Sequence, residues 1–167
     1  IDNIVMARHI VELQKLKQIC SMAKMDAIME DVASAIESDE KVIIFTQYTS
    51  TLINFRNAIY ERKLRCVTLS GEDNAEERQK SVDCFQSGGA DIFVGNIKAA
   101  GIGITLTAAT NVFFADLDWT PAVHDQAADR AHRIGQTGTV NVRYYVARGT
   151  VEEHIMEMLD KKRQIID

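Results

Sequence analysis

The sequence has few of the features that mark membrane, zinc-binding or disulfide-rich proteins. It contains no long uninterrupted apolar run, so we expect no membrane span. Its three cysteines, Cys20, Cys66 and Cys84, are far apart and form no Cys-x-x-Cys pair or cysteine–histidine cluster. This pattern argues against a structural zinc site or a disulfide framework and favours a reducing, intracellular compartment. Ile1 follows no basic stretch or signal peptide, and we expect the chain to be a segment of a longer protein.

An excess of basic residues is also missing. Nineteen Lys and Arg against 24 Asp and Glu give a net charge of −5, which disfavours a free-standing coat protein that binds DNA non-specifically. A local positive patch on an acidic domain could still contact nucleic acid. With 46% apolar and 26% charged residues, the 167-residue chain has the composition of one globular domain.

Apolar residues alternate along the chain between strand-like and helix-like spacing. Short apolar runs predict five strands, at residues 42–45, 66–69, 92–94, 111–115 and 140–146. Spacings of three and four, with candidate caps, predict helices over 6–37 (in two pieces), from Thr49 or Ser50, from Asn74 to about Gln86, over 122–134 and from Thr150 onward.

Asn74 with Glu77, and Thr150 with Glu153, have the spacing of capping boxes, and the only proline, Pro121, stands at the start of a predicted helix. Strand and helix alternate throughout, which predicts an α/β fold with a parallel sheet and helices on both faces, in three layers. Ligands of such sheets bind at the carboxyl ends of the strands.

The common nucleotide-binding motifs are incomplete. No glycine precedes a lysine, so the phosphate-binding GxxxxGK[ST] pattern is absent. Gly101 and Gly103 begin a dinucleotide fingerprint, but Leu106 occupies the place of its third glycine. The acidic pair at 39–40 precedes a strand and is interpreted as a solvated turn. We therefore expect no complete nucleotide site within this chain.

The most informative segment is Asp125–Gln136. If it is helical, Gln126, Asp129, Arg130 and Arg133 share one face, and two arginines one turn apart can present a rigid double fork to phosphate oxygens. The alternative is a solvated face with an Asp129–Arg133 pair. His132 is interpreted as a packed or hydrogen-bonded residue, because no serine or cysteine nucleophile stands in a suitable motif.

Six ordered blocks resemble one family. The segment 126–136 resembles motif VI of the Snf-type (switch/sucrose-non-fermenting) ATPases of helicase superfamily two. Five further blocks occur in the family's order: 42–50 resembles motif IV, 69–71 with 76–79 the next block, 96–106 motif V, 118–121 the tryptophan–proline block, and 149–153 the segment after motif VI.

The family has two RecA-like lobes with ATP between them, and this chain resembles the second lobe only. The resemblance implies one domain over 1–167, with a leading helix at 1–21, a core at 22–150 and a C-terminal helix at 151–167. The phosphate loop and magnesium ligands belong to the family's first lobe. ATP with Mg²⁺ is therefore expected to bind mainly there, this chain is expected to hold no metal, and the isolated chain is expected to be inactive.

The resemblance also implies roles for individual residues. Arg130 and Arg133 correspond to catalytic arginines that reach the ATP phosphates, and Gly101, Gly103 and Gln126 to the ATP cleft. Trp119 corresponds to a tryptophan that lies against the DNA minor groove, although a sole tryptophan can equally be a buried core anchor. The other candidates for contacts to the DNA backbone are Gln47, Thr49, Ser70, Gly71, Lys98 and Thr105, the last in place of the family's asparagine.

The function implied is that of the second lobe of a DNA-dependent ATPase that translocates on double-stranded DNA and remodels protein–DNA complexes or branched DNA. The expected partners are the first lobe of the same polypeptide, double-stranded DNA and DNA-bound proteins, with no membrane. The expected location is at DNA, in a nucleus or a nucleoid. Two alternatives remain: an RNA helicase lobe, and a non-catalytic interaction domain on a RecA-like scaffold.

Overall fold

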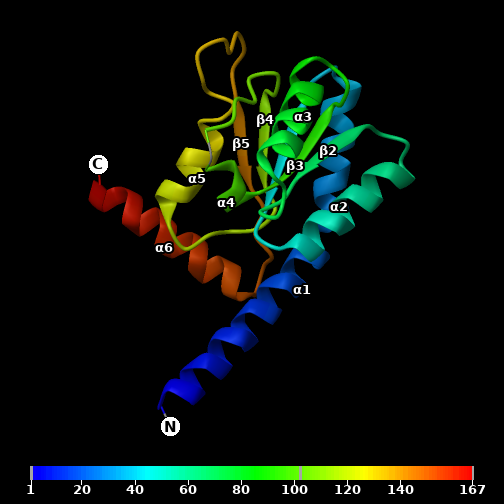
Figure 1. Cartoon of the computed structure of the whole chain (residues 1–167). Helices are drawn as coiled ribbons and strands as arrows, with labels where there is room; N and C mark the ends of the chain where they lie inside the picture. The colour runs from blue at the N-terminus through cyan, green and yellow to red at the C-terminus, as the bar shows by residue number, and fades with distance from the viewer. Residues whose placement is uncertain (1, 102, 167) are drawn as a thin grey trace.

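The computed structural model describes residues 2–101 and 103–166 (Figure 1). Strands and helices alternate in the order α1 (Asp2–Glu37), β1 (Val42–Thr46), α2 (Thr49–Glu61), β2 (Cys66–Leu69), α3 (Ala75–Gln86), β3 (Ile92–Asn96), α4 (Ile97–Ala100), β4 (Asn111–Phe114), α5 (Pro121–Ala128), β5 (Asn141–Tyr144) and α6 (Val151–Ile166).

All five strands pair in parallel, in the order β2-β3-β1-β4-β5. Val42 at the start of the central strand pairs with Ile92 of β3 on one side and Asn111 of β4 on the other. Every residue of β1 and β4 is buried, as expected for strands covered on both faces, whereas the edge strand β5 alternates between exposed and half-buried positions. The predicted α/β fold is confirmed, and its sheet and helices match a RecA-like architecture.

Two apolar cores lie on opposite faces of the sheet. One contains Met29 of α1 and Phe55 of α2, and the other contains Phe85 of α3 and Ala127 of α5. The helices therefore cover both faces, as Figure 1 shows. A smaller cluster places α6 against Leu117, below the ends of the strands.

The predicted helix starts have mixed outcomes. Asn74 caps α3 as predicted: its side chain accepts the Glu77 N–H at 2.9 Å, and the Glu77 carboxylate accepts the Asn74 N–H at 2.9 Å. The predicted caps of α2 are wrong, because the helix begins at Thr49 after Tyr48 and has no side-chain cap. At α6 the Thr150 hydroxyl accepts the N–H of Glu152 rather than that of Glu153.

Two predicted helix boundaries are also wrong. The first helix runs unbroken over Asp2–Glu37 instead of forming two pieces, so residue 21 lies inside it. The helix predicted over 122–134 ends at Ala128. Tertiary hydrogen bonds hold the following turn: the Arg130 carbonyl accepts the Leu106 N–H at 2.8 Å, and the Gln136 amide donates to the Ala109 carbonyl at 2.8 Å. The four residues predicted to share one helical face therefore span a helix end and a turn.

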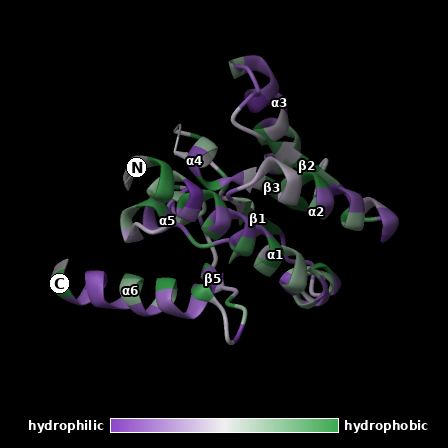
Figure 2. Cartoon of the chain, turned by 90° about the horizontal axis from the view of Figure 1, so that it is seen from below, coloured by the Kyte–Doolittle hydropathy of each residue, from purple (hydrophilic) through white to green (hydrophobic). Residues whose placement is uncertain are grey.

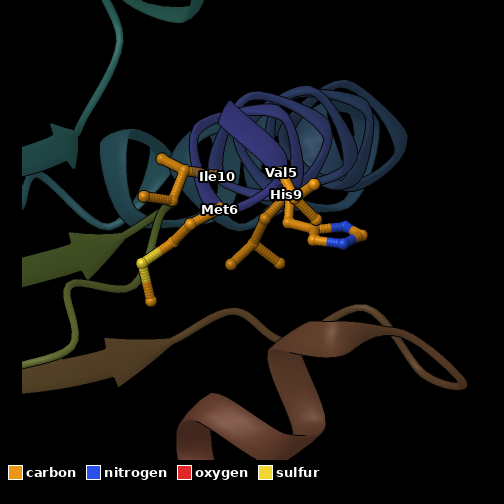
Figure 3. Close-up of a pocket in the computed structure, with 5 residues that line it drawn as sticks. Val5, Met6, His9 and Ile10 are labelled. Carbon is orange, nitrogen blue, oxygen red and sulfur yellow. The ribbon is translucent and has the colours of Figure 1, made fainter. Parts of the chain in front are cut away.

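The N-terminal half of α1 projects beyond the sheet (Figure 1), and its first turns include exposed apolar side chains (green in Figure 2). Val5, Met6, His9 and Ile10 line a shallow hollow of about 450 Å³ along this half, together with Leu13 (Figure 3). No helix among the described residues is long and apolar enough to cross a membrane.

Candidate functional site

The structure gathers the five predicted ATP-cleft and catalytic residues at one place, here called the arginine site: Gly101, Gly103, Gln126, Arg130 and Arg133. Arg130 Nη2 donates to the Gly101 carbonyl at 3.3 Å, and Arg133 Nη1 donates to the Gly103 carbonyl at 3.1 Å. Gln126 lines a shallow hollow of about 530 Å³ with both arginines. The segment after α4 and the turn after α5 thus meet through these two side chains.

The two arginines differ in environment. Arg130 is buried, with 6% of its surface exposed, whereas Arg133 is exposed. Arg130 Nε is buried and has no hydrogen-bond partner among the described residues. Burial lowers the pKa of Arg130, and the positive charge of Arg133 lowers it further. Two adjacent cations, one with an unused donor, form a place where an anionic group would be stabilised.

The two glycines of the arginine site play different backbone roles. Gly103 has φ of +61°, a conformation that glycine adopts without strain, and an added Cβ would meet nothing within 4 Å. Gly101 has an ordinary φ of −60°, but a Cβ there would lie 3.2 Å from the Lys98 carbonyl and 3.5 Å from Gln126 Oε1. Close packing against α4 and Gln126 is what favours glycine at position 101.

Four of the seven predicted DNA contacts line a second feature, here called the strand-end groove, of about 590 Å³: Gln47, Gly71, Lys98 and Trp119. They follow β1, β2, β3 and β4 respectively. Because the carboxyl ends of parallel strands meet at one edge of the sheet, these four residues lie together. Lys98 lies on the four-residue helix α4, which is followed directly by Gly101, so this helix leads from the groove to the arginine site.

The other three predicted DNA contacts lie elsewhere. Thr49 is the exposed first residue of α2. Ser70 is engaged in a turn, since its backbone N–H and hydroxyl both donate to the Asp73 carboxylate, at 2.6 and 3.2 Å. The Thr105 hydroxyl accepts from Arg133 Nη1 at 3.3 Å, so Thr105 lies at the arginine site rather than in the groove.

Trp119 is not a buried core residue, because 37% of its surface is exposed. Its ring lies 5.4 Å from Lys17 Nζ, and its carbonyl accepts from Lys162 Nζ at 2.8 Å. Helices α1 and α6 therefore both contact this residue. A large, flat, partly exposed ring at the rim of a groove is suited to contact a ligand surface.

Sequence reasoning missed a buried polar network beside the groove. Lys17, Ser21 and Lys24, here called the polar stripe of α1, are spaced at i, i+4 and i+7 and are all buried. Ser21 donates to Asp116, and Lys24 forms an ion pair with Glu152 at 2.7 Å. The i, i+4, i+7 spacing of these polar residues was the available signal, but nothing local showed that this stripe, among the many polar residues of α1, would be buried.

Burial also changes the protonation of Asp116 in this network. Its carboxylate accepts the Gln47 N–H at 2.8 Å, which lowers its pKa, but burial outweighs this bond and raises the pKa to about 6. The described residues contain no group of three or more His, Cys, Asp or Glu that could hold a metal ion. The Asp116 and Glu152 carboxylates of the network accept hydrogen bonds from protein donors.

Comparison with known proteins gives the family. The helicase conserved C-terminal domain model matches residues 23–135. The chain belongs to the helicase conserved C-terminal domain family. In this helicase lobe the matched range includes the arginine site and, apart from α1, the strand-end groove.

Individual relatives agree with the Snf-type assignment of this helicase lobe. It is 36% identical over 147 residues to the human DNA annealing helicase and endonuclease ZRANB3, covering 87% of this chain and 14% of that protein. It is 33% identical over 162 residues to an uncharacterized ATP-dependent helicase of Mycoplasma pneumoniae, covering 95% of this chain and 16% of that protein. The crystal structure of the C-terminal part of the Fun30 ATPase domain superposes with a TM-score of 0.78 at 33% identity, covering 81% of this chain and 45% of that one.

Proposed function

We propose that this chain is the second lobe of a DNA-dependent ATPase that translocates on double-stranded DNA and remodels protein–DNA complexes or branched DNA. The chain spans about one sixth of the length of the curated relatives above, at 16% and 14%. ATP binding would therefore be shared with a first lobe of the same polypeptide, which we expect to hold most of the nucleotide and its Mg²⁺. We expect the protein to act at DNA inside the cell.

The arginine site is the observation that carries the proposal. The buried, unpartnered Nε of Arg130 and the exposed guanidinium of Arg133 fit an anion with several oxygens, such as the phosphates of ATP. Bound ATP supplies the phosphoanhydride bond that water cleaves. The arginines would stabilise negative charge on the phosphate oxygens, which is the role of an arginine finger. Gly103 has a left-handed backbone and open space beside it, so the phosphates would be able to approach its backbone closely, next to Arg133.

The residues that line the strand-end groove support the proposal that the second ligand is a DNA polymer. Its rim combines the exposed Lys98, the bare backbone of Gly71 and the partly exposed ring of Trp119. Such groups contact a phosphate backbone and sugar edges without selecting a base, which suits a motor that steps over any sequence. The net charge of −5 indicates that much of the affinity for DNA comes from the partner lobe.

ATP hydrolysis by the two-lobe parent, with and without duplex DNA, tests the proposal. We expect DNA to stimulate hydrolysis in the wild type, and Arg133→Ala to lower kcat by about 10³-fold or more. Arg133 is exposed, so this variant should keep its fold, as circular dichroism can verify. Arg148→Ala, at another exposed arginine, is the matched control and should leave kcat unchanged. The isolated chain should not hydrolyse ATP.

Three other results would contradict the proposal or favour one of the alternative functions. Stimulation by single-stranded RNA in preference to duplex DNA would identify an RNA helicase lobe. A parent that neither hydrolyses ATP nor responds to DNA would point to an interaction domain. An Arg133→Ala variant that is folded and fully active would remove the arginine site from the chemistry.

A further inference from the structure

Lys17 is a buried cation whose hydrogen bonds go to neutral oxygens. Only 4% of its surface is exposed, and its Nζ donates to Gln47 Oε1 at 2.6 Å and to the Leu117 carbonyl at 2.8 Å. The ion pairs found among the described residues do not include Lys17. Burying a charge without a direct ion pair is costly, so packing alone would favour an apolar side chain at this position.

The two acceptors of Lys17 come from the two loops that frame the strand-end groove. Gln47 follows β1, and Leu117 lies between β4 and Trp119. One ammonium on α1 therefore adds a third element to two neighbouring loops, which also share the bond from the Gln47 N–H to the Asp116 carboxylate. Burial lowers the pKa of Lys17, while the nearby carboxylates of Asp116 and Asp118 raise it.

Lys17 also fixes which way the Gln47 amide points. An ammonium only donates, so Gln47 must turn its oxygen toward Lys17 and its NH₂ toward Asp118, where Nε2 donates to Oδ2 at 2.9 Å. The second oxygen of that carboxylate accepts the Thr120 N–H at 2.9 Å. The chain of bonds thus runs from α1 through Gln47 to both sides of Trp119.

We propose that Lys17 is a positioning residue for the strand-end groove: it orients Gln47 and thereby holds the Asp118–Thr120 turn that presents Trp119. The DNA part of this inference rests on the proposed function, but the positioning of Trp119 does not. Both polar atoms of the Gln47 side chain form hydrogen bonds inside the protein. Gln47 therefore links α1 to the Asp118–Thr120 turn.

The rest of the polar stripe continues the same connection. Ser21 donates to Asp116, and Lys24 Nζ donates to the Ala115 and Tyr145 carbonyls. The stripe therefore holds the residues that follow β1, β4 and β5, three adjacent strands. A change in the angle of α1 would be passed to the Trp119 turn through these bonds.

Trp119 provides the first readout, because it is the only tryptophan of the chain. Lys17→Met keeps an unbranched side chain, one heavy atom shorter, and removes its donors. We expect a red shift of Trp119 emission and stronger quenching by acrylamide, with unchanged far-ultraviolet circular dichroism. Lys15→Met, an exposed neighbour on the same helix, is the matched control and should have a wild-type spectrum. Lys17→Arg, which keeps a cationic donor, should restore most of the wild-type signal.

A second variant covers the case in which Lys17→Met does not fold. Gln47→Glu keeps an acceptor for Lys17 but places an anion against Asp118, so the Trp119 turn should loosen and give the same red shift. Wild-type emission and quenching in a folded Lys17→Met variant, or in Gln47→Glu when the first does not fold, would overturn the inference.

The same variants in the two-lobe parent test the link to DNA. We expect Lys17→Met to raise the duplex DNA concentration for half-maximal stimulation by about tenfold, which corresponds to about 1.4 kcal/mol. A wild-type parent that DNA does not stimulate would refute the proposed function, while the fluorescence result still decides the role of Lys17. Normal DNA stimulation in Lys17→Met would refute the link between Lys17 and DNA.

Discussion

The backbone N–H of Asp118 donates a hydrogen bond of 3.1 Å to Nε2 of His124, six residues further along the chain. Because Nε2 accepts, the imidazole carries its proton on Nδ1, which is buried without a partner among the described residues. Burial lowers the pKa of His124 and favours this neutral form. The bond ties the start of the Trp119 turn to α5, so the turn is held from α5 as well as from α1.

Replacing His124 should therefore destabilise the protein. His124→Leu leaves the buried Asp118 N–H without its acceptor, and we expect a loss of about 1–3 kcal/mol in the free energy of unfolding. Urea denaturation measures this loss. His154→Leu is the control, because the His154 side chain is 84% exposed, and it should change the free energy little. Equal stability of the two variants would show that the Asp118–His124 bond is not needed.

Asp116 should make the protein less stable as the pH rises from about 4 to 6. Burial raises its pKa from 3.8 to about 6, so the folded state binds this proton more tightly than the unfolded state does. The stabilisation is present below pH 4 and is lost as the pH rises through 6. Asp116→Asn removes the titration, so wild type should lose about 2–3 kcal/mol relative to the variant over this range. Chemical denaturation of both proteins at several pH values checks this, and parallel curves would contradict it.

The buried Lys24–Glu152 ion pair should be strongly coupled. The two side chains are 8% and 1% exposed, and Glu152 also accepts the Ala147 N–H at 2.8 Å. Lys24→Met leaves a buried carboxylate without its cation and should cost about 3–5 kcal/mol. The Lys24→Met/Glu152→Gln double variant should lose less than the sum of the single variants in a denaturation cycle. Additive losses would mean that the pair is not coupled.

The exposed ion pair between Arg8 and Glu12 serves as the comparison for the buried Lys24–Glu152 pair. Arg8 and Glu12 lie 3.1 Å apart on α1 but are 80% and 53% exposed. Glu12→Gln should change the free energy of unfolding by less than about 0.5 kcal/mol. The comparison separates the effect of burial from that of charge.

Two substitutions at Gly103 should separate the effect of backbone strain on stability from the effect of the added side chain on ATP hydrolysis. Asparagine tolerates a φ of +61°, so Gly103→Asn should keep most of its stability, whereas the β-branched Gly103→Val should lose about 1–3 kcal/mol. If Gly103 serves close approach at the arginine site, both variants should lower kcat/KM for ATP by about tenfold or more, near 1.4 kcal/mol. Denaturation and steady-state kinetics of the parent measure the two effects. A fully active Gly103→Asn variant would show that Gly103 is needed only for the turn and not for the approach of ATP.

Much of the fold was predictable from local patterns. The five strands lie within one or two residues of the predicted ranges. The signal was clearest for β1 and β4, because strands covered on both faces must be apolar. The cap at Asn74 was predictable because both of its hydrogen bonds are made within four residues. Six ordered motifs gave the family and a set of candidate residues, six of which, Thr105 included, meet at the arginine site.

The errors fall where distant contacts decide the local structure. Residues 129–136 have a helical pattern, but the Gln136 amide and the Arg130 carbonyl bond to the segment 106–109 and draw the chain into turns. The place of Thr105 was likewise not predictable: its hydroxyl accepts from Arg133 Nη1, while its contact with DNA stays a prediction. Neither contact leaves a sign in the neighbouring sequence, because the partners are more than 20 residues away.

The sequence by itself determined the alternation of strands and helices, the parallel sheet and the family, because each depends on local periodicity or on short motifs. Only the tertiary structure decided the unbroken first helix and the partners of Lys17, Ser21 and Lys24. A buried charge is stable only when its partners lie around it, and the partners of Lys17 and Lys24 come from loops and from α6, 30 to 128 residues away. Folding is what brings them together.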